Sequence, residues 1–486
     1  MRNTVKYIPA VLAFAAAAVL LQGCGAAVRK CEDPQVDIPQ TIVPGEEADS
    51  LCLADLEWSE IFSDPLLKDL IEKTLENNKD MLTAAARVRE LERRHRIVRA
   101  EQFPEFGARG YLNQENYTYT DEAPVKDNEF GLKASVSWEV DLFGRLRWAN
   151  RGAIAEYLSS VESQRAMQMT LVAAVATAYF ELTALDNELD IVLRTLDTRR
   201  ESVRQAKLRF DGGLTTEIPY QQAQVEYAST ASLVPDLERD IALKEHEISL
   251  LAGEFPSSVE RSLLNTHDKF PDLMHVGIPS ELLQRRPDLM AAEQDLKSAM
   301  ADVGIAWADR FPRLSLSFTA GVENNTFTRF FTGPYWYPVI DLTSPLFAFG
   351  KNKARYQAAI EAYNQEKYQY EEKVLEVFKE VNDAVTSYRS AHEKVALMGN
   401  LKDASRKYVE LALFQYQNGY TNYMDVLDAQ RSYFDAEIDY SNSVRDEFLA
   451  IIDLYKALGG GWSVPSDEEA EATADNTKTA SKKTGK

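Results

Sequence analysis

One turn motif occurs twice in this chain, about 200 residues apart, and this repetition constrains the fold more than any other feature. The first copy reads RFDGGLTTEIPYQQAQ at residues 209–224, and the second reads QYQNGYTNYMDVLDAQ at residues 415–430. In each copy an aromatic residue precedes a glycine by three positions, and the segment ends in Ala-Gln. A motif that recurs together with its surroundings indicates internal duplication.

Other landmarks recur in the same order at nearly the same offset. The offset is 206 positions for Gly144 and Gly350 and for Gly213 and Gly419, and 208 for the Phe-Pro pairs at 103–104 and 311–312. We therefore expect a tandem repeat, with a first unit at 64–255 and a second at 282–462. The proline-containing segment 256–281 would lie between the two units and bulge out at mid-height.

Alternation of apolar and polar residues predicts two strands in each unit. The pattern is clear at 130–142 and 314–322, and weaker at 106–119 and 336–346. Pro338 weakens the last prediction, because proline cannot donate a hydrogen bond to a strand ladder. Each predicted strand has one apolar face and one polar face.

Two stretches of about 66 residues without proline, 145–210 and 351–418, predict long helices of about 100 Å at 1.5 Å per residue. Apolar residues follow each helix at alternating spacings of four and three. This spacing is characteristic of coiled-coil packing. The seam residues are Leu171, Val175, Ala178, Leu182, Leu185, Leu189, Val192 and Leu196 in the first helix, and Val377, Val381, Ala384, Tyr388, Ala391, Val395 and Met398 in the second.

Four membrane-type strands per chain would require an oligomer. An open sheet edge cannot face lipid, and the smallest membrane barrels have about eight strands. Two chains would give a barrel filled by side chains, whereas three would give twelve strands and room for a lumen. The polar faces, with Lys133, Glu139, Asp141 and Glu323, favour a water-filled lumen and therefore a homotrimer. A soluble antiparallel sheet packed on helices would give the same pattern and is the alternative.

The N-terminus has the features of a secretory signal peptide. Arg2 and Lys6 precede an apolar stretch at 8–21 that is short for a membrane-spanning helix, and LQGC follows at 21–24. This order resembles a bacterial lipobox, which implies removal of residues 1–23 and lipid modification, including palmitate, of Cys24. Residues 24–63 would then form a lipidated N-terminal segment. Gly25 favours sorting to the outer membrane. An ordinary signal peptide with a chance cysteine is the alternative.

Several other properties narrow the function. The net charge of -22 argues against a nucleic-acid partner. Motifs for a nucleophile, a phosphate loop or ATP binding are absent from the sequence, and the spacing of His267 and His275 matches no zinc template. We therefore expect no enzyme activity, no metal and no cofactor.

Cys31 and Cys52 can either pair in an oxidising compartment or remain free thiols. The polar tail at 463–486 is expected to be disordered.

The duplication, together with PDLMAAEQDL, FPRLSLS, LFAFGK and YQNGYTNYMDVLDAQRSY, resembles the outer membrane factor family. This family comprises the TolC-like exit ducts of efflux pumps and type I secretion systems, and the resemblance extends over about residues 57–462. A lipobox is typical of the branch that serves resistance-nodulation-division efflux pumps. The resemblance implies an α+β membrane protein, a homotrimer whose 12-stranded outer-membrane β-barrel is continuous with a long periplasmic α-helical barrel.

The resemblance also implies a passive duct that accepts small molecules from an inner-membrane pump and a periplasmic adaptor and opens at its helical tips. A type I protein-secretion duct and a structural coiled-coil envelope lipoprotein are the alternatives. In family terms, the residues at the tips that meet the adaptor are Arg209, Gly213, Leu214, Gly419 and Tyr420.

The resemblance places a periplasmic gate at Tyr416, Asp425 and Asp428. The two aspartates are three positions apart and share one helix face, so a trimer would carry a ring of carboxylates that attracts cations. Some family members lock the closed tips with an aspartate at the position of Pro219 and an arginine at that of Thr421. Neither residue is present here, so this lock is not expected.

Overall fold

A computed structural model describes residues 31–39, 41, 53, 56–117, 125–263, 279–344 and 347–462 of the 486-residue chain. The predicted signal peptide, Cys24, Cys52, the two histidines considered for a metal and the polar tail lie outside these residues. The chain divides into two compact units. The sheet unit includes Ala86–Glu162 and Met290–Lys373, and the helical unit includes Ser163–Leu289 and Val374–Lys486.

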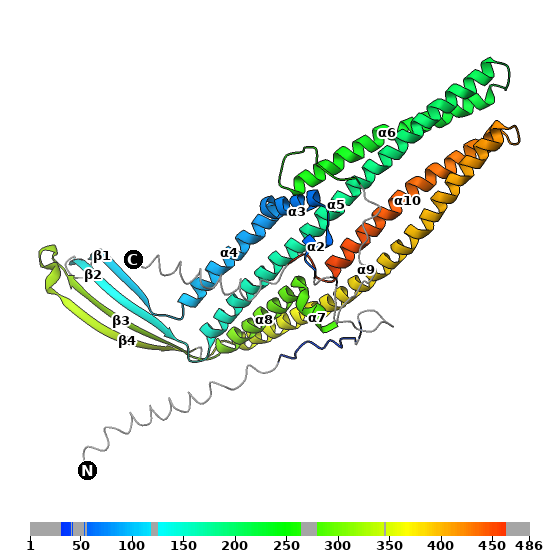
Figure 1. Ribbon diagram of the computed structural model, residues 1–486. Helices are drawn as coiled ribbons and strands as arrows, with labels where there is room; N and C mark the ends of the chain where they lie inside the picture. The colour runs from blue at the N-terminus through cyan, green and yellow to red at the C-terminus, as the bar shows by residue number, and fades with distance from the viewer. Residues whose placement is uncertain are drawn as a thin grey trace, which may run out of the picture. The chain divides into compact units, whose positions relative to one another are not determined.

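Two series of elements follow the same order along the chain (Figure 1). The first series is α4 (Lys79–Ala100), β1 (Glu105–Tyr117), β2 (Val125–Val140), α5 (Arg145–Asp211) and α6 (Ile218–Leu251). The second is α8 (Pro287–Ala308), β3 (Arg313–Asn324), β4 (Pro334–Thr343), α9 (Lys351–Gln417) and α10 (Tyr423–Ala457). Shorter elements are α2 (Trp58–Ile61), α3 (Pro65–Asn77), α7 (Pro279–Arg285) and the 3-10 helix η3 (Phe327–Thr332). The predicted strands and both long helices, each of 67 residues, are confirmed.

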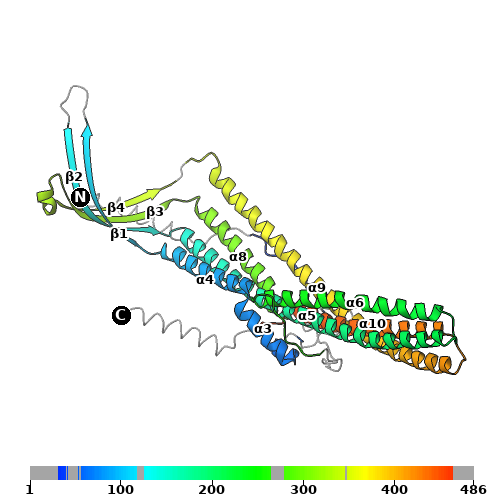
Figure 2. The same ribbon diagram turned by 90° about the horizontal axis from the view of Figure 1, so that it is seen from above.

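The four strands form one antiparallel sheet in the order β1-β2-β3-β4 (Figure 1, Figure 2). Pro338 lies in β4, an edge strand of the sheet within one chain, which is where proline is tolerated in sheets. Within the described residues, the outer edges of β1 and β4 have no neighbouring strand.

One face of the sheet is apolar and exposed. Phe106, Leu112, Trp336 and Ile340 all lie on it, and 77% of Phe106 and 74% of Ile340 is exposed. A soluble chain rarely leaves so many large apolar side chains on one continuous surface. The opposite face is polar, and Tyr111 of β1 reaches across Gly131 of β2 to donate a hydrogen bond to Glu323 of β3 at 2.7 Å.

Among the described residues, α5 contains a stretch long and apolar enough to cross a membrane as a helix. Most of that stretch is buried against other parts of the chain, as in the core helix of a soluble protein. It is therefore weak evidence for a membrane-spanning helix.

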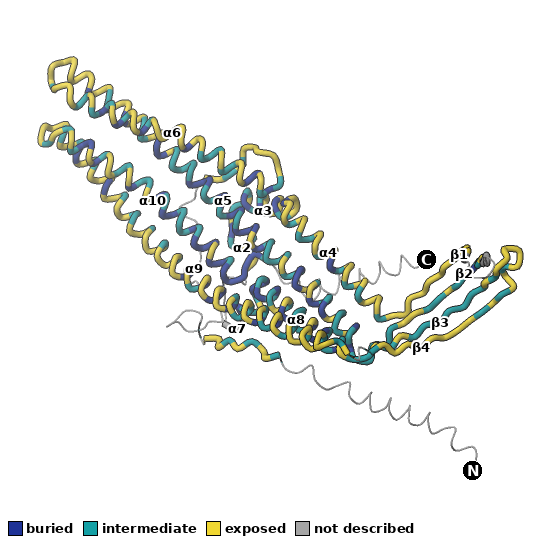
Figure 3. Tube along the Cα trace, turned by 180° about the vertical axis from the view of Figure 1, so that it is seen from behind, coloured by how far each residue is buried: buried dark blue, intermediate teal, exposed yellow. Residues whose placement is uncertain are grey.

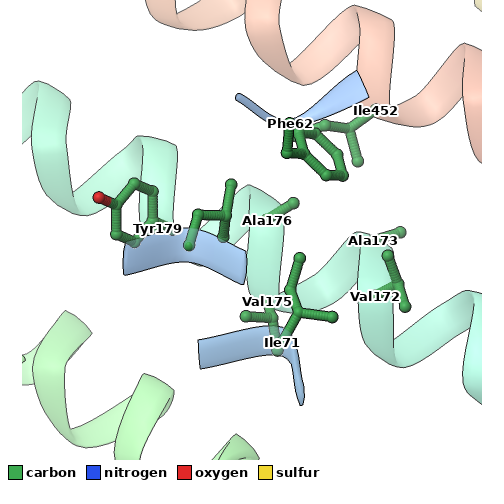
Figure 4. Close-up of a cluster of buried hydrophobic side chains, with 9 residues drawn as sticks. Phe62, Ile71, Val172, Ala173, Val175, Ala176, Tyr179 and Ile452 are labelled. Atoms are coloured by element: carbon green, nitrogen blue, oxygen red, sulfur yellow. The ribbon is translucent and has the colours of Figure 1, made fainter. Parts of the chain in front are cut away.

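The predicted seams face inward in both long helices. Every seam residue of α5 and α9 is buried or half-buried, and Figure 3 shows buried positions along the middle of α5 and of α10. In the helical unit, Phe62 and Ile71 pack against Val175 and Tyr179 of α5, together with Ile452 of α10 (Figure 4). Complete burial of a side chain such as Ile71 contributes roughly 1.5–3 kcal/mol to folding.

Residues 256–263 are the described part of the segment between the two repeats, and they are hydrogen-bonded to this core. Arg261 binds the carboxylates of Asp186 on α5 and Glu245 on α6. The backbone N–H of Ser262 donates to the hydroxyl of Tyr179 at 3.0 Å, and that hydroxyl donates to Asp64. Charge-assisted hydrogen bonds of this kind hold residues that have little apolar surface to bury.

In the sheet unit, the N-terminal residues 31–36 run beside α9. Cys31 contacts a cluster that includes Tyr363, whose hydroxyl donates to the carbonyl of Glu32 at 3.3 Å. The N–H of Gln35 donates to the carboxylate of Glu371 at 2.9 Å. Pairing of Cys31 with Cys52 stays a prediction, because Cys52 lies outside the described residues.

Candidate functional site

The two turns that carry the repeated motif have the same backbone geometry. Gly213 follows α5 with φ of 69°, and Gly419 follows α9 with φ of 77°. The residue after each glycine donates a backbone hydrogen bond to the carbonyl five residues before it in the helix. The Leu214 N–H donates to the carbonyl of Arg209 at 2.9 Å, and the Tyr420 N–H donates to the carbonyl of Gln415 at 2.9 Å. This is the Schellman arrangement, in which the left-handed position strongly favours glycine.

Both turns expose the apolar residue that follows the glycine. In a Schellman motif this residue frequently packs against the last turn of its own helix. Here 74% of Leu214 and 82% of Tyr420 is exposed. No atom lies within 4 Å of where a Cβ on Gly213 or Gly419 would project. Each tip therefore presents an accessible stretch of backbone beside a projecting apolar side chain, which suits contact with another protein.

Arg209 and Tyr416, assigned to docking and to the gate respectively, are in direct contact. The guanidinium carbon of Arg209 on α5 lies 5.0 Å from the ring centroid of Tyr416 on α9. The Tyr416 ring also lies 5.6 Å from that of Tyr423 on α10. The contact joins the hairpin formed by α5 and α6 to the hairpin formed by α9 and α10.

Asp425 and Asp428 have different surroundings. Asp425 forms a capping box with Asn422: its N–H donates to the Asn422 side chain at 3.2 Å, and its carboxylate accepts the Asn422 N–H at 3.3 Å. The hydroxyl of Thr421 donates to the same carboxylate. Asp428 is exposed, and the Tyr408 hydroxyl is 3.4 Å from its Oδ2. Asp425 thus stabilises the start of α10, whereas Asp428 leaves its charge accessible to water.

The positions of the absent lock have local structural roles. Pro219 is in the first turn of α6, where the absence of its N–H breaks no helical hydrogen bond. The hydroxyl of Thr421 donates its hydrogen bond to the carboxylate of Asp425. Neither residue bridges two helical hairpins through any contact found among the described residues.

A buried cluster of charged residues joins α5, α6 and α10. This cluster was not predicted from the sequence. Arg199 of α5 donates to the carbonyl of Glu226 on α6 at 2.9 Å and also pairs with its carboxylate at 3.2 Å. Nε of Arg431 on α10 donates to the same carboxylate at 2.9 Å. Only 7% of Arg199 and 8% of Glu226 is exposed. Burial lowers the pKa of the Arg199 guanidinium, whereas the bond to Glu226 raises that of Arg431.

The sequence contains one signal for this cluster. Continuing the spacing of the α5 seam by three positions beyond Leu196 leads to Arg199, where an apolar residue is expected. A charged residue at a buried seam position requires a partner, because an unpaired buried charge is costly. The sequence does not identify that partner, Glu226, which lies 27 residues from Arg199, or Arg431, which lies 205 residues from Glu226.

The chain is similar to known proteins over most of its length. The profile of the family described as outer membrane efflux protein matches residues 70–254 and 278–460. The toluene efflux pump outer membrane protein TtgF of Pseudomonas putida is 31% identical over 429 residues, which cover 86% of this chain and 88% of the relative. The cation efflux system protein CusC of Escherichia coli is 29% identical, with 83% and 88% covered. The solved outer-membrane channel OprN has a TM-score of 0.81 at 27% identity, covering 90% of this chain and 98% of OprN.

Proposed function

This chain belongs to the outer membrane efflux protein family, and on that premise we propose that three copies close one barrel through which small molecules leave the periplasm. Membership makes the protein an outer-membrane component of an efflux pump rather than an enzyme. The trimer, the residues of the gate and the docking surface are the proposal.

The proposal of a shared barrel rests on the faces and the edges of the sheet. Its apolar face suits lipid, its polar face suits a water-filled lumen, and its two unpaired edges lie on β1 and β4. In lipid, unpaired backbone groups on both edges would each cost several kcal/mol. Pairing β1 of one copy with β4 of the next removes every edge, and three copies give twelve strands. Glu323 and Tyr111 would then face the lumen.

The helical hairpins would continue the duct into the periplasm. Each chain contributes two tips of the same geometry, so three chains would offer six similar docking positions. We propose that a periplasmic adaptor binds at Gly213, Leu214, Gly419 and Tyr420, with Arg209 beside them. The exposed apolar residues at both turns support this surface. The energy for transport would come from an inner-membrane pump.

Asp428 is the proposed selective residue at the entrance. Three copies of this exposed carboxylate would attract cations and repel anions. Asp425 would contribute less to this ring, since its carboxylate is engaged in the capping box. The relatives are named for toluene and for cations, so we propose small-molecule cargo and leave its identity open.

Lipid attachment at Cys24 is compatible with the path of the N-terminal segment. Tyr363, which binds Glu32, lies about 18 Å along α9 from Lys351 at 1.5 Å per residue. A fully extended chain from Cys24 to Cys31 reaches about 25 Å. A lipid on Cys24 could therefore insert into the membrane beside the end of α9 that follows the sheet.

The mass of the detergent-extracted oligomer tests the proposal. Native mass spectrometry of outer-membrane fractions should give three mature chains, and these particles should form cation-selective pores in a planar bilayer. A monomer, or a trimer that forms no pores, would overturn the proposed duct.

A further inference from the structure

The polar face of the sheet carries two positive charges side by side. Arg109 of β1 and Lys133 of β2 stand directly opposite one another in the antiparallel ladder. Like charges at opposed positions of two strands repel each other and destabilise the sheet. The pair is therefore a candidate for a role other than folding of the sheet.

Neither cation forms an ion pair with a carboxylate in the part of the chain that the structure describes. Two carboxylates on the same face are instead engaged by uncharged donors. Glu323 accepts a hydrogen bond from the hydroxyl of Tyr111 at 2.7 Å, and Glu129 accepts one from the side chain of Asn113 at 2.9 Å. The positive charge of the pair is thus not neutralised within one chain.

The ring of Tyr111 holds both cations at the surface of the sheet. Its side chain spans β2 to reach Glu323 on β3, so the ring lies along the sheet and against Gly131. The guanidinium carbon of Arg109 is 5.9 Å from the ring centroid, and Nζ of Lys133 is 5.5 Å from it. Each such contact contributes about 0.5–1 kcal/mol at an exposed site. An uncharged ring positions the two cations but leaves their charge available to a solute.

We propose that Arg109 and Lys133 of three copies form a basic ring inside the barrel, and that this ring binds organic carboxylates. The site rests on the proposed duct, because the polar face of the sheet must line the lumen. An arginine presents paired N–H donors that match a carboxylate, and the lysine beside it adds a second positive charge. A bound carboxylate also offsets the repulsion within the pair. Small organic anions are then one class of solute that the duct admits.

The basic ring is distinct from the acidic ring proposed at the entrance. Asp428 follows the second turn, whereas Lys133 lies in the sheet. The helix α9, which joins the sheet to that turn, has 67 residues and a length of about 100 Å. Charges this far apart in water are screened from one another, since the Debye length is about 8 Å at physiological ionic strength. The two rings can therefore be tested separately, each from its own side of a bilayer.

Block of the purified full-length trimer in a planar bilayer tests the basic ring. Benzoate added on the side where the barrel opens should reduce the current until the effect saturates. Benzylammonium, of similar size and opposite charge, should not. Combining Arg109→Gln with Lys133→Gln should raise the benzoate concentration for half-block about tenfold, since a hydrogen bond to a charged group contributes about 1.5–3 kcal/mol. This double variant should assemble normally, because the substitutions remove a repulsion.

Arg313→Gln is the matched control. Arg313 lies on the same face of the sheet, opposite Thr343, but its guanidinium binds the carboxylate of Asp309 at 2.6 Å. Its removal should leave the benzoate concentration for half-block unchanged.

Three results would overturn the basic ring while leaving the duct intact. The first is a conducting trimer that benzoate does not block, and the second is an equal loss of block in the control. The third is a double variant with a lower melting temperature of the trimer and unchanged block, which would identify the two cations as contacts between subunits. If the unmodified protein formed no pores, the proposed duct and the ring would both be wrong.

Discussion

The guanidinium of Arg209 lies over the ring of Tyr416, 5.0 Å from its centroid, and joins the two repeats of the chain at their turns. The contact is solvent-accessible, so its contribution is about 0.5–1 kcal/mol. A contact of this strength helps to hold the two turns together but does not fix them by itself.

Arg209→Gln should therefore increase the open fraction of the pore by about threefold. Single-channel recording measures this ratio. Lys207→Gln, which removes an equal charge from an exposed position two residues away, is the control. Equal effects in the two variants would attribute the change to charge alone and contradict a specific contact with the ring.

Leu214→Asp should separate docking from conduction. A carboxylate on this exposed side chain leaves the turn geometry intact, because the hydrogen bond to Arg209 uses only the backbone. Pores of the isolated trimer should conduct as before, while export by cells should fall strongly. Leu250→Asp is the matched control, since Leu250 is also 74% exposed and lies at the other end of α6. If both variants exported normally, Leu214 would not contact the adaptor.

Asp428→Ala and Asp425→Ala should have different effects. Asp428→Ala should move the reversal potential of the pore toward zero in a salt gradient, as a ring of exposed carboxylates is lost. Asp425→Ala should instead destabilise the start of α10 by about 1 kcal/mol, because it removes one half of the capping box. Bilayer recordings and thermal unfolding measure the two effects, and an exchange of phenotypes would contradict the assignment.

Tyr179 should make the helical unit sensitive to alkali. Burial, followed by the hydrogen bond to Asp64, raises the pKa of Tyr179 from its ordinary value near 10 to about 12. The folded protein holds this proton more tightly than the unfolded chain. The resulting stability, about 3 kcal/mol, is complete below about pH 10 and is lost as the pH rises through about 12.

Tyr179→Phe should accordingly reduce the fall in melting temperature between pH 10 and 12, although the variant is less stable at neutral pH. The fall should not disappear, because the pKa values of Tyr433 and Tyr455 are raised to about 12 as well. Circular dichroism of the helices measures the profile, with the exposed Tyr420→Phe as control. A slope unchanged from that of the unmodified protein would contradict this role of Tyr179.

The fold was largely predictable because its local patterns and its packing agree. The seam from Leu171 to Leu196 predicts the buried side of α5, and the alternation around Lys133 predicts the faces of β2. Pro338 argued against a strand that does form, because β4 is an edge strand within one chain and edge strands tolerate proline.

The site was only partly predictable because its roles depend on contacts between distant residues. Gly213 and Gly419 were identified by their motif, and the geometry of both turns follows from it. Asp425 and Asp428 are indistinguishable by spacing, yet one caps a helix and the other is exposed. The pairing of Glu226 with Arg431 required the arrangement of the hairpins, which no local pattern encodes.

The open edges of β1 and β4 also have a consequence for the cell. If the barrel in the membrane is shared among copies, no chain can complete its own insertion. The number of ducts then depends on how often chains meet. Halving synthesis would then lower the number of ducts by more than half, and a single copy with a defective edge would spoil the two sound copies beside it. In a cell that makes both altered and unaltered chains, the altered chain would then be dominant whenever it still assembles.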